Sequence, residues 1–238
     1  MILRCFCCNN LDERMIKLHK EACSLVGIEV QYWLFSIAEL ASKNIRPHVM
    51  HGLFLEQLLR ESPSEVVGII DADCILSSAD FLASCQDKVK ESGTIIGLAQ
   101  CANHLPSRNY IYAAPAFMLV NAEAWHDLGQ PSLVASSQFD TAQQLSHALE
   151  TNGLDFEVIM PDCHSNIGPS WPLAGKGSYG IGACYGDKHA FHLFQSAKGA
   201  SYLGLLERQV QRLRDGFDTF SCSQSSEQVL AADRLHAN

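Results

Sequence analysis

The first hundred residues alternate short apolar runs with helical segments, and this alternation restricts the possible folds more than any other feature. Apolar runs at 2–8, 29–35, 65–70 and 94–98 are typical of buried strands, because each is short and rich in aliphatic or aromatic residues. Between them, apolar residues recur every three or four positions over 11–26, 47–60 and 81–89, which predicts helices. Parallel strands need such helical connections. The sequence therefore predicts an α/β protein: a single Rossmann-like domain with a mostly parallel central sheet flanked by helices.

The second half of the chain is less regular. Pro115 falls inside an apolar run, and proline suits a bulge or a sheet edge because it has no N–H to donate. Residues 161–187 hold six glycines and three prolines with no periodicity. We therefore expect a structureless stretch there, of the kind that is usually functional or disordered. The remaining pattern predicts strands at 110–121, 156–160 and 190–194 and helices at 122–128, 140–152 and 202–213.

The composition excludes several classes of protein. The chain has 238 residues, with 17 Lys and Arg against 26 Asp and Glu, for a net charge of −9. This acidic balance argues against nucleic acid as a partner, since binding its phosphates needs a basic face. No apolar run approaches the roughly 20 residues of a transmembrane helix, so we expect no transmembrane segment. The start lacks the features of a secretory signal, and the ten cysteines fit buried thiols, so we expect a cytoplasmic protein.

Two acids follow the most strongly apolar strand of the sequence. Asp71 and Asp73 are two residues apart after the strand at 65–70, so both side chains lie on the same side if the backbone stays extended. Ligands of open α/β sheets bind beyond the carboxyl ends of the strands. Carboxylate oxygens suit Mg²⁺ or Mn²⁺, and the pair could share one such ion. The alternative is that one aspartate caps the turn while the other is solvated.

This arrangement resembles a known family. The strand that ends in Asp71-Ala72-Asp73 resembles the D-x-D motif of nucleotide-sugar-dependent glycosyltransferases with the A-type fold. The segment 112–121, followed by Trp125, is similar to that family's second-half strand and the helix after it. His192-Leu193-Phe194 is similar to the late histidine that often completes the family's metal site. The resemblance extends to about residue 200.

The resemblance implies one glycosyltransferase domain over 1–220. Its nucleotide-binding half would be 1–100, and its acceptor half 101–220 with the glycine-rich loop at 161–187; 221–238 would be a polar tail. The implied activity is transfer of a sugar from a nucleoside-diphosphate sugar to an unidentified glycan, lipid or protein acceptor.

The resemblance also implies roles for the metal-site residues. Asp73 would coordinate the cation directly, Asp71 would bind it through water or hold the donor ribose, and His192 would be the third ligand. An imidazole ligand favours Mn²⁺ over Mg²⁺. His189 is a rival ligand, and a half-buried core position is the alternative for His192.

Three further residues are candidates for the substrate site, and the sequence patterns that indicate them are less specific than the D-x-D motif. Asn9, in the first loop, would serve the nucleotide. Lys176, in the glycine-rich loop, would meet the diphosphate, although this loop is not a P-loop. Asp140, before a predicted helix, is the candidate catalytic carboxylate near the acceptor, where an inverting transferase needs a group to take the acceptor proton. Helix N-capping explains Asp140 equally well.

Two other functions remain open at this stage. Haloacid-dehalogenase phosphohydrolases also have an apolar strand ending in D-x-D, in which the first acid is the nucleophile. That family expects Thr or Val where this sequence has Ile75, and a later acidic pair. The second is a non-catalytic module that binds a sugar nucleotide, and the fold alone does not exclude it.

Overall fold

A six-stranded central sheet organises the computed structural model, which describes residues 1–62, 65–194 and 202–222. The strand order is β2-β1-β3-β6-β5-β7. Strand β1 is parallel to both β2 and β3, β5 is parallel to β7, and β6 runs antiparallel to its two neighbours. The prediction of an α/β protein with a mostly parallel central sheet is therefore confirmed. The bounds are β1 Ile2–Cys8, β2 Glu29–Phe35, β3 Val66–Ile70, β5 Ile95–Cys101, β6 Ile111–Asn121 and β7 Glu157–Ile159.

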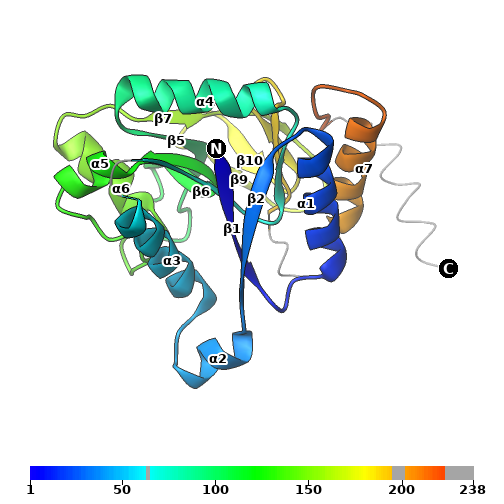
Figure 1. The fold of residues 1–238 in the computed structure, drawn as a ribbon. Helices are drawn as coiled ribbons and strands as arrows, with labels where there is room; N and C mark the ends of the chain where they lie inside the picture. The colour runs from blue at the N-terminus through cyan, green and yellow to red at the C-terminus, as the bar shows by residue number, and fades with distance from the viewer. Residues whose placement is uncertain (63–64, 195–201, 223–238) are drawn as a thin grey trace.

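Helices cover both faces of this sheet (Figure 1). Helices α3 (Pro47–Glu61), α5 (Ala122–Asp127) and α6 (Gln143–Thr151) share one apolar core with one face of the sheet. Helices α1 (Glu13–Leu25) and α4 (Ala79–Ser92) pack on the other face. Helix α7 (Leu203–Arg214) lies beside α1, and the short α2 (Ile37–Ser42) follows β2. Both sides of the sheet are thus buried, as parallel strands require.

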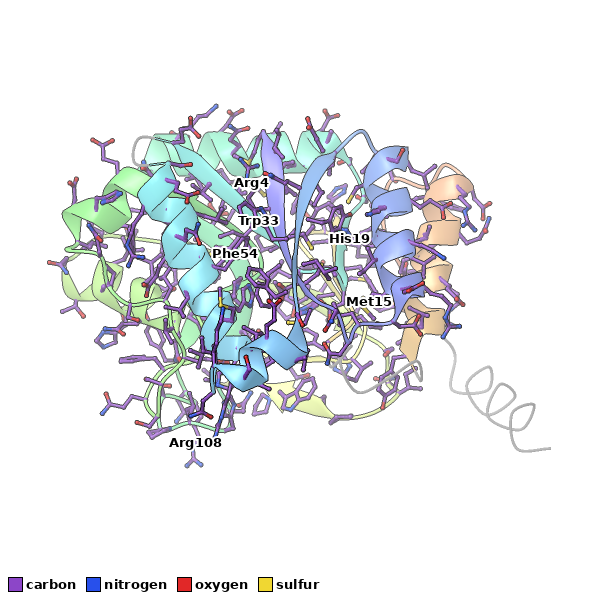
Figure 2. All side chains as sticks on the ribbon, turned by 60° about the horizontal axis from the view of Figure 1, so that its bottom comes forward. Arg4, Met15, His19, Trp33, Phe54 and Arg108 are labelled. Carbon is purple, nitrogen blue, oxygen red and sulfur yellow. The ribbon has the colours of Figure 1, made fainter. Side chains whose placement is uncertain are left out.

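Aromatic rings fix α3 against the edge of the sheet. Trp33 of β2 packs on Phe54 of α3, with 5.6 Å between ring centroids, and Figure 2 shows both rings between these elements. Phe6 of β1 lies 5.7 Å from the same Phe54. The burial of these rings positions α3 and its polar residues next to the carboxyl ends of β1 and β3.

A second, smaller sheet is built from β4 (Cys74–Leu76), β12 (Ala190–His192), β11 (Ala183–Tyr185) and β8 (Pro161–His164), in that order. Strands β9 (Ser170–Pro172) and β10 (Ser178–Gly180) form a separate hairpin. Residues 161–187 therefore contain four strands, and the expectation that they are structureless is wrong. Each strand is only three or four residues long, which is too short to produce a readable period.

Pro115 lies in the central strand β6 and at a bulge. Gly97 of β5 pairs with Met118, whereas the next residue, Leu98, pairs with Ala114. The intervening residues of β6, including Pro115, have no partner in β5, so the missing N–H of proline costs no ladder hydrogen bond. Of the two alternatives, the bulge is confirmed and the sheet edge is wrong, because β6 has neighbours on both sides.

Two further observations concern the ends and helices of the chain. Of the predicted polar tail 221–238, Ser221 and Cys222 lie against the body, and 223–238 falls outside the described residues. Throughout the described residues, every helix is too short or too polar to cross a bilayer.

Candidate metal centre

The two acids of the D-x-D motif lie in a turn between the two sheets. Strand β3 ends at Ile70, and the Asp71 N–H donates to the Ala116 carbonyl at 2.8 Å, which holds the first acid against β6. The Cys74 N–H then donates to the Asp71 carbonyl at 3.0 Å and closes the turn. The backbone is therefore not extended from Asp71 to Asp73, and the turn rather than the strand pleat brings the two carboxylates together.

His192 reaches these acids from the small sheet. Strand β12 pairs with β4 so that His192 stands opposite Cys74, and the Leu193 N–H donates to the Asp73 carbonyl at 2.9 Å. His192 Nε2 then lies 3.4 Å from Asp73 Oδ1. One donor atom from each of Asp71, Asp73 and His192 lies within 4.8 Å of the other two. This Asp-Asp-His cluster could bind a metal ion.

The electrostatics of the cluster favour a cation. Burial raises the pKa of Asp71 well above its usual value, and the adjacent charge of Asp73 raises it further. Two neighbouring carboxylates repel each other unless a proton or a cation lies between them. A divalent ion neutralises both, and two oxygens with one imidazole nitrogen form a donor set that Mn²⁺ accepts. The chemistry of these residues therefore fits a divalent cation.

A second histidine faces the acids from α3. His51 Nε2 lies 3.6 Å from Asp71 Oδ1, and its ring stacks on Phe6 at 4.8 Å. Burial lowers the pKa of His51 to about 4, although the charge of Asp73 opposes this shift, so the ring is neutral at pH 7. His51 is not among the candidate residues that the sequence pattern indicated. Its spacing from Asp71 follows no motif, so only the fold could reveal the contact.

The rival ligand, His189, has a different environment. Its Nδ1 lies 2.8 Å from Ser77 Oγ, and its ring stacks on Phe81 at 5.3 Å. His189 is not part of the cluster formed by Asp71, Asp73 and His192. The geometry therefore favours His192 over His189 as the third ligand.

The other predicted site residues are placed differently. Asn9 is exposed and follows the carboxyl end of β1, the strand that neighbours β3. Its Oδ1 accepts a hydrogen bond from the Ile37 N–H at 3.0 Å. Lys176 is exposed in the turn between β9 and β10. Neither belongs to the cluster, and their contacts with a donor remain predictions.

Asp140 is half-buried and lies outside the cluster. Tyr112 Oη donates to Asp140 Oδ2 at 3.1 Å, and the Thr141 N–H donates to Oδ1 at 2.8 Å. Helix α6 begins at Gln143 with Ala142 as its N-cap, so the alternative that Asp140 caps this helix is wrong. A hollow beside Asp140 also includes Arg46 and His48, and the catalytic role of Asp140 remains a prediction.

An aromatic pocket adjoins the Asp-Asp-His cluster. Trp171, Tyr179 and Phe194 line it, with ring centroids between 5.1 and 5.8 Å apart. Phe194 also packs on the ring of His192 at 3.7 Å, so the pocket begins next to the cluster. Tyr179 Oη donates to the Cys101 carbonyl at 2.7 Å, which fixes one wall of the pocket to β5. Such flat apolar walls with a few polar groups are typical of small-molecule sites.

Comparison with known proteins does not assign a family. No protein-family model matches the sequence, and no curated protein matches it. Among solved structures, the chain is similar to the crystal structure of a glycosyltransferase involved in the glycosylation of the major capsid of PBCV-1. The two sequences are 12% identical, and the match covers 87% of this chain and 100% of that chain with a TM-score of 0.41. A likeness at this level leaves the family of the chain open.

Proposed function

We propose that the chain is a metal-dependent glycosyltransferase of the A-type fold that takes its sugar from a nucleoside-diphosphate sugar. The observation that supports this most is the convergence of Asp71, Asp73 and His192 within 4.8 Å just beyond the carboxyl end of β3. The carboxyl ends of parallel strands form the usual ligand-binding edge of an open α/β sheet. A D-x-D pair at that edge, completed by an imidazole, suits a cation that is bridged to phosphates.

In this proposal, Asp71, Asp73 and His192 hold Mn²⁺ or, less favourably, Mg²⁺. The bound ion would supply Lewis-acid stabilisation of the charge on the departing nucleoside diphosphate. Asn9 lies at the carboxyl end of the neighbouring parallel strand, so the nucleotide would extend towards β1. The aromatic pocket of Trp171, Tyr179 and Phe194 provides the adjoining space for a substrate.

The cluster gives less support to the phosphohydrolase alternative. That chemistry needs a further acidic pair to complete its magnesium site. Within the described residues, the third member of the group around Asp71 and Asp73 is an imidazole rather than an acid. A non-catalytic module would bind the same donor without consuming it, so turnover distinguishes it from a transferase.

Release of nucleoside diphosphate tests the proposal. The full chain would be incubated with UDP-, GDP-, CDP- and ADP-sugars, a panel of monosaccharide acceptors, and either Mn²⁺ or EDTA. We expect Mn²⁺-dependent release of the nucleoside diphosphate from one donor. In Asp73→Asn, the rate of release should fall by at least about 100-fold, because the amide offers the cation no negative charge. Asp87→Asn is the matched control, since Asp87 is exposed on α4. Release that is unaffected by EDTA, or equal in Asp73→Asn, would contradict the proposal.

A further inference from the structure

Three cysteines from distant parts of the sequence meet on the small sheet. Cys163 of β8 and Cys184 of β11 are direct cross-strand partners. Cys222, from the segment after α7, lies over them, and one sulfur from each residue lies within 4.8 Å of the other two. None of these cysteines belongs to the Asp-Asp-His cluster, so the group needs an explanation of its own.

The position of Cys222 is fixed by its neighbours. Gln209, buried in α7, donates from Nε2 to the Ser221 carbonyl at 2.6 Å and accepts from the Ser221 N–H at 3.1 Å. The Phe220 N–H donates to the Lys188 carbonyl at 2.8 Å, and the Phe220 ring is buried against Phe191. The fold therefore holds the Cys222 thiol next to the thiols of Cys163 and Cys184.

Three sulfurs that lie within 4.8 Å of one another can share one thiophilic cation. Cys184 and Cys222 have sulfurs 2.7 Å apart, which exceeds the roughly 2.05 Å of a disulfide bond. A disulfide would also use only two of the three thiols. Around a zinc ion with Zn–S bonds of about 2.3 Å, tetrahedral geometry separates the sulfurs by about 3.8 Å. The sulfurs of Cys184 and Cys222, which lie 2.7 Å apart, would therefore move apart by about 1 Å to bind the ion.

We propose that Cys163, Cys184 and Cys222 form a zinc site with three thiolate ligands. Binding of Zn²⁺ releases three thiol protons to solvent and forms three Zn–S bonds, with no change of oxidation state. Cys163 and Cys222 also line an open hollow with Asp162, His164 and Lys188, so a water molecule can fill the fourth position from that side. The zinc would attach the segment after α7 to the sheet that carries His192.

Cation binding to the reduced full chain tests this proposal. After treatment with EDTA, the chain would be titrated with Zn²⁺ against a chromophoric chelator, and with Cd²⁺ while the thiolate-to-metal absorption is recorded. We expect one tightly bound equivalent of either ion and a thiolate absorption band with Cd²⁺. The affinity of this tight site should fall by at least about 100-fold in Cys163→Ser and in Cys222→Ser. Cys163→Ser provides a second variant if Cys222→Ser fails to fold.

Two controls separate this site from the rest of the molecule. Cys85→Ser changes a buried thiol of α4 outside the group, and Asp73→Asn changes only the Asp-Asp-His cluster; both should retain the tight site. The absence of a thiolate band, or a band that persists in Cys163→Ser and Cys222→Ser, would overturn the proposal. A Cys184–Cys222 disulfide, found by mass spectrometry of the chain kept without reductant and with Zn²⁺ present, would also overturn it. None of these results depends on glycosyl transfer.

Discussion

His19 is a fully buried histidine behind the acid pair, and its environment sets a pH dependence. It lies on α1 (Figure 2), and its Nδ1 is 2.6 Å from Tyr32 Oη. Burial lowers the pKa of His19 to about 4, although the charge of Asp73 opposes the shift. The unfolded chain takes up a proton on this ring below pH about 6.5, whereas the folded chain does so only near pH 4. Acidification between these values therefore favours unfolding.

We predict that His19→Gln weakens this pH dependence. Between pH 7 and pH 5, protonation of His19 in the unfolded state costs the wild-type chain about 2 kcal/mol of its free energy of unfolding. The variant should lose about that much less over the same interval, as measured by urea denaturation at the two pH values. His51 adds a loss of the same sign, but it is common to both chains.

His48→Gln is the matched control, because His48 is exposed on α3. The free energy of unfolding of His48→Gln should decrease from pH 7 to pH 5 by as much as that of the wild type. If His19→Gln and the wild type lose the same free energy between pH 7 and pH 5, the account of His19 as a buried neutral ring is wrong.

At the residue scale, the sequence indicated the acids more readily than the histidines around them. Asp71 and Asp73 stand out because a strongly apolar strand ends abruptly in charge. His51 and His19 carry no such signal, since each lies on an amphipathic helix whose buried face depends on tertiary packing. The three cysteines of the proposed zinc site were also undetected as a group, because their separations in sequence match no ligand spacing.

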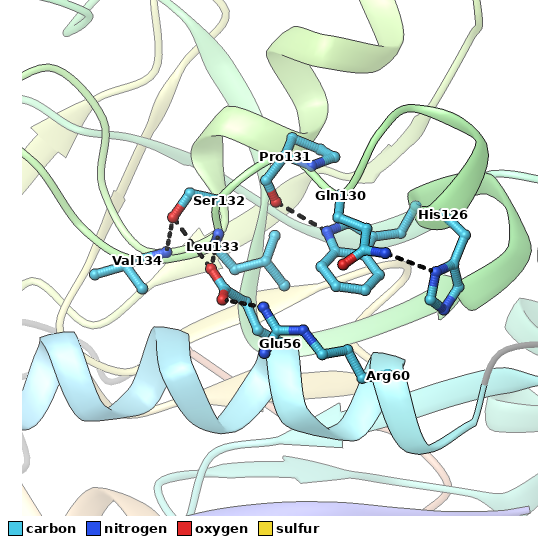
Figure 3. Close-up of polar contacts among 9 residues, drawn as sticks. Glu56, Arg60, His126, Gln130, Pro131, Ser132, Leu133 and Val134 are labelled. Atoms are coloured by element: carbon cyan, nitrogen blue, oxygen red, sulfur yellow. Dashed lines mark hydrogen bonds and ion pairs between the residues drawn. The ribbon is translucent and has the colours of Figure 1, made fainter.

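Helix α3 illustrates how an element is positioned by contacts that sequence periodicity does not reveal. Buried Glu56 accepts from Ser132 Oγ and the Leu133 N–H through Oε1, and from Arg60 through Oε2 (Figure 3). One turn earlier, Gly52 lies so close to the same loop that an added Cβ would be 2.5 Å from Val134 Cα. The helix is thus held against the 131–134 segment by a hydrogen-bonded carboxylate and a close backbone approach.

We predict opposite effects of alanine at two helical glycines. Gly52→Ala should lower the free energy of unfolding by about 1–3 kcal/mol, because its methyl group would collide with backbone atoms that have no free rotation. Gly204→Ala in α7 should leave it unchanged or raise it by up to about 1 kcal/mol, since the new Cβ meets only the far end of Arg208. Urea denaturation of both variants measures the difference, and a Gly52→Ala chain as stable as the wild type would refute this packing.

At the element scale, most elements were predictable, including the short β7, β12 and α5. Within the described residues, those that the sequence pattern did not indicate are the short elements α2, β4 and β8 to β11. Clear patterns of apolar residues in the sequence mark helices α1, α3 and α4 and strands β1, β2 and β3. Strand β4 has only three residues, and the sequence indicated a strand over 110–121 without its partners. The pairing of β4 with β12, which brings His192 to Asp73, is a long-range contact that the sequence pattern does not encode.

At the scale of the whole molecule, the Asp-Asp-His cluster lies where two sheets meet. Asp71 follows the last residue of β3 in the central sheet, and Asp73 precedes β4 in the small sheet, which also carries His192 on β12. The cluster therefore requires both sheets and the turn that joins them. In the proposed function, this junction holds a divalent cation against the diphosphate of a donor.

The melting temperature of the chain in the presence of nucleoside diphosphates shows whether the cation and the diphosphate bind together at this junction. UDP, GDP, CDP and ADP would each be added with Mn²⁺ or with EDTA, to the wild type, Asp73→Asn and Asp87→Asn. At about 100 times the dissociation constant, binding adds about 2.7 kcal/mol, which should raise the melting temperature by about 5–10 °C. We predict this rise for at least one nucleotide, only with Mn²⁺, in the wild type and Asp87→Asn but not in Asp73→Asn. No rise with any of the four nucleotides, or an equal rise in EDTA, would contradict the account.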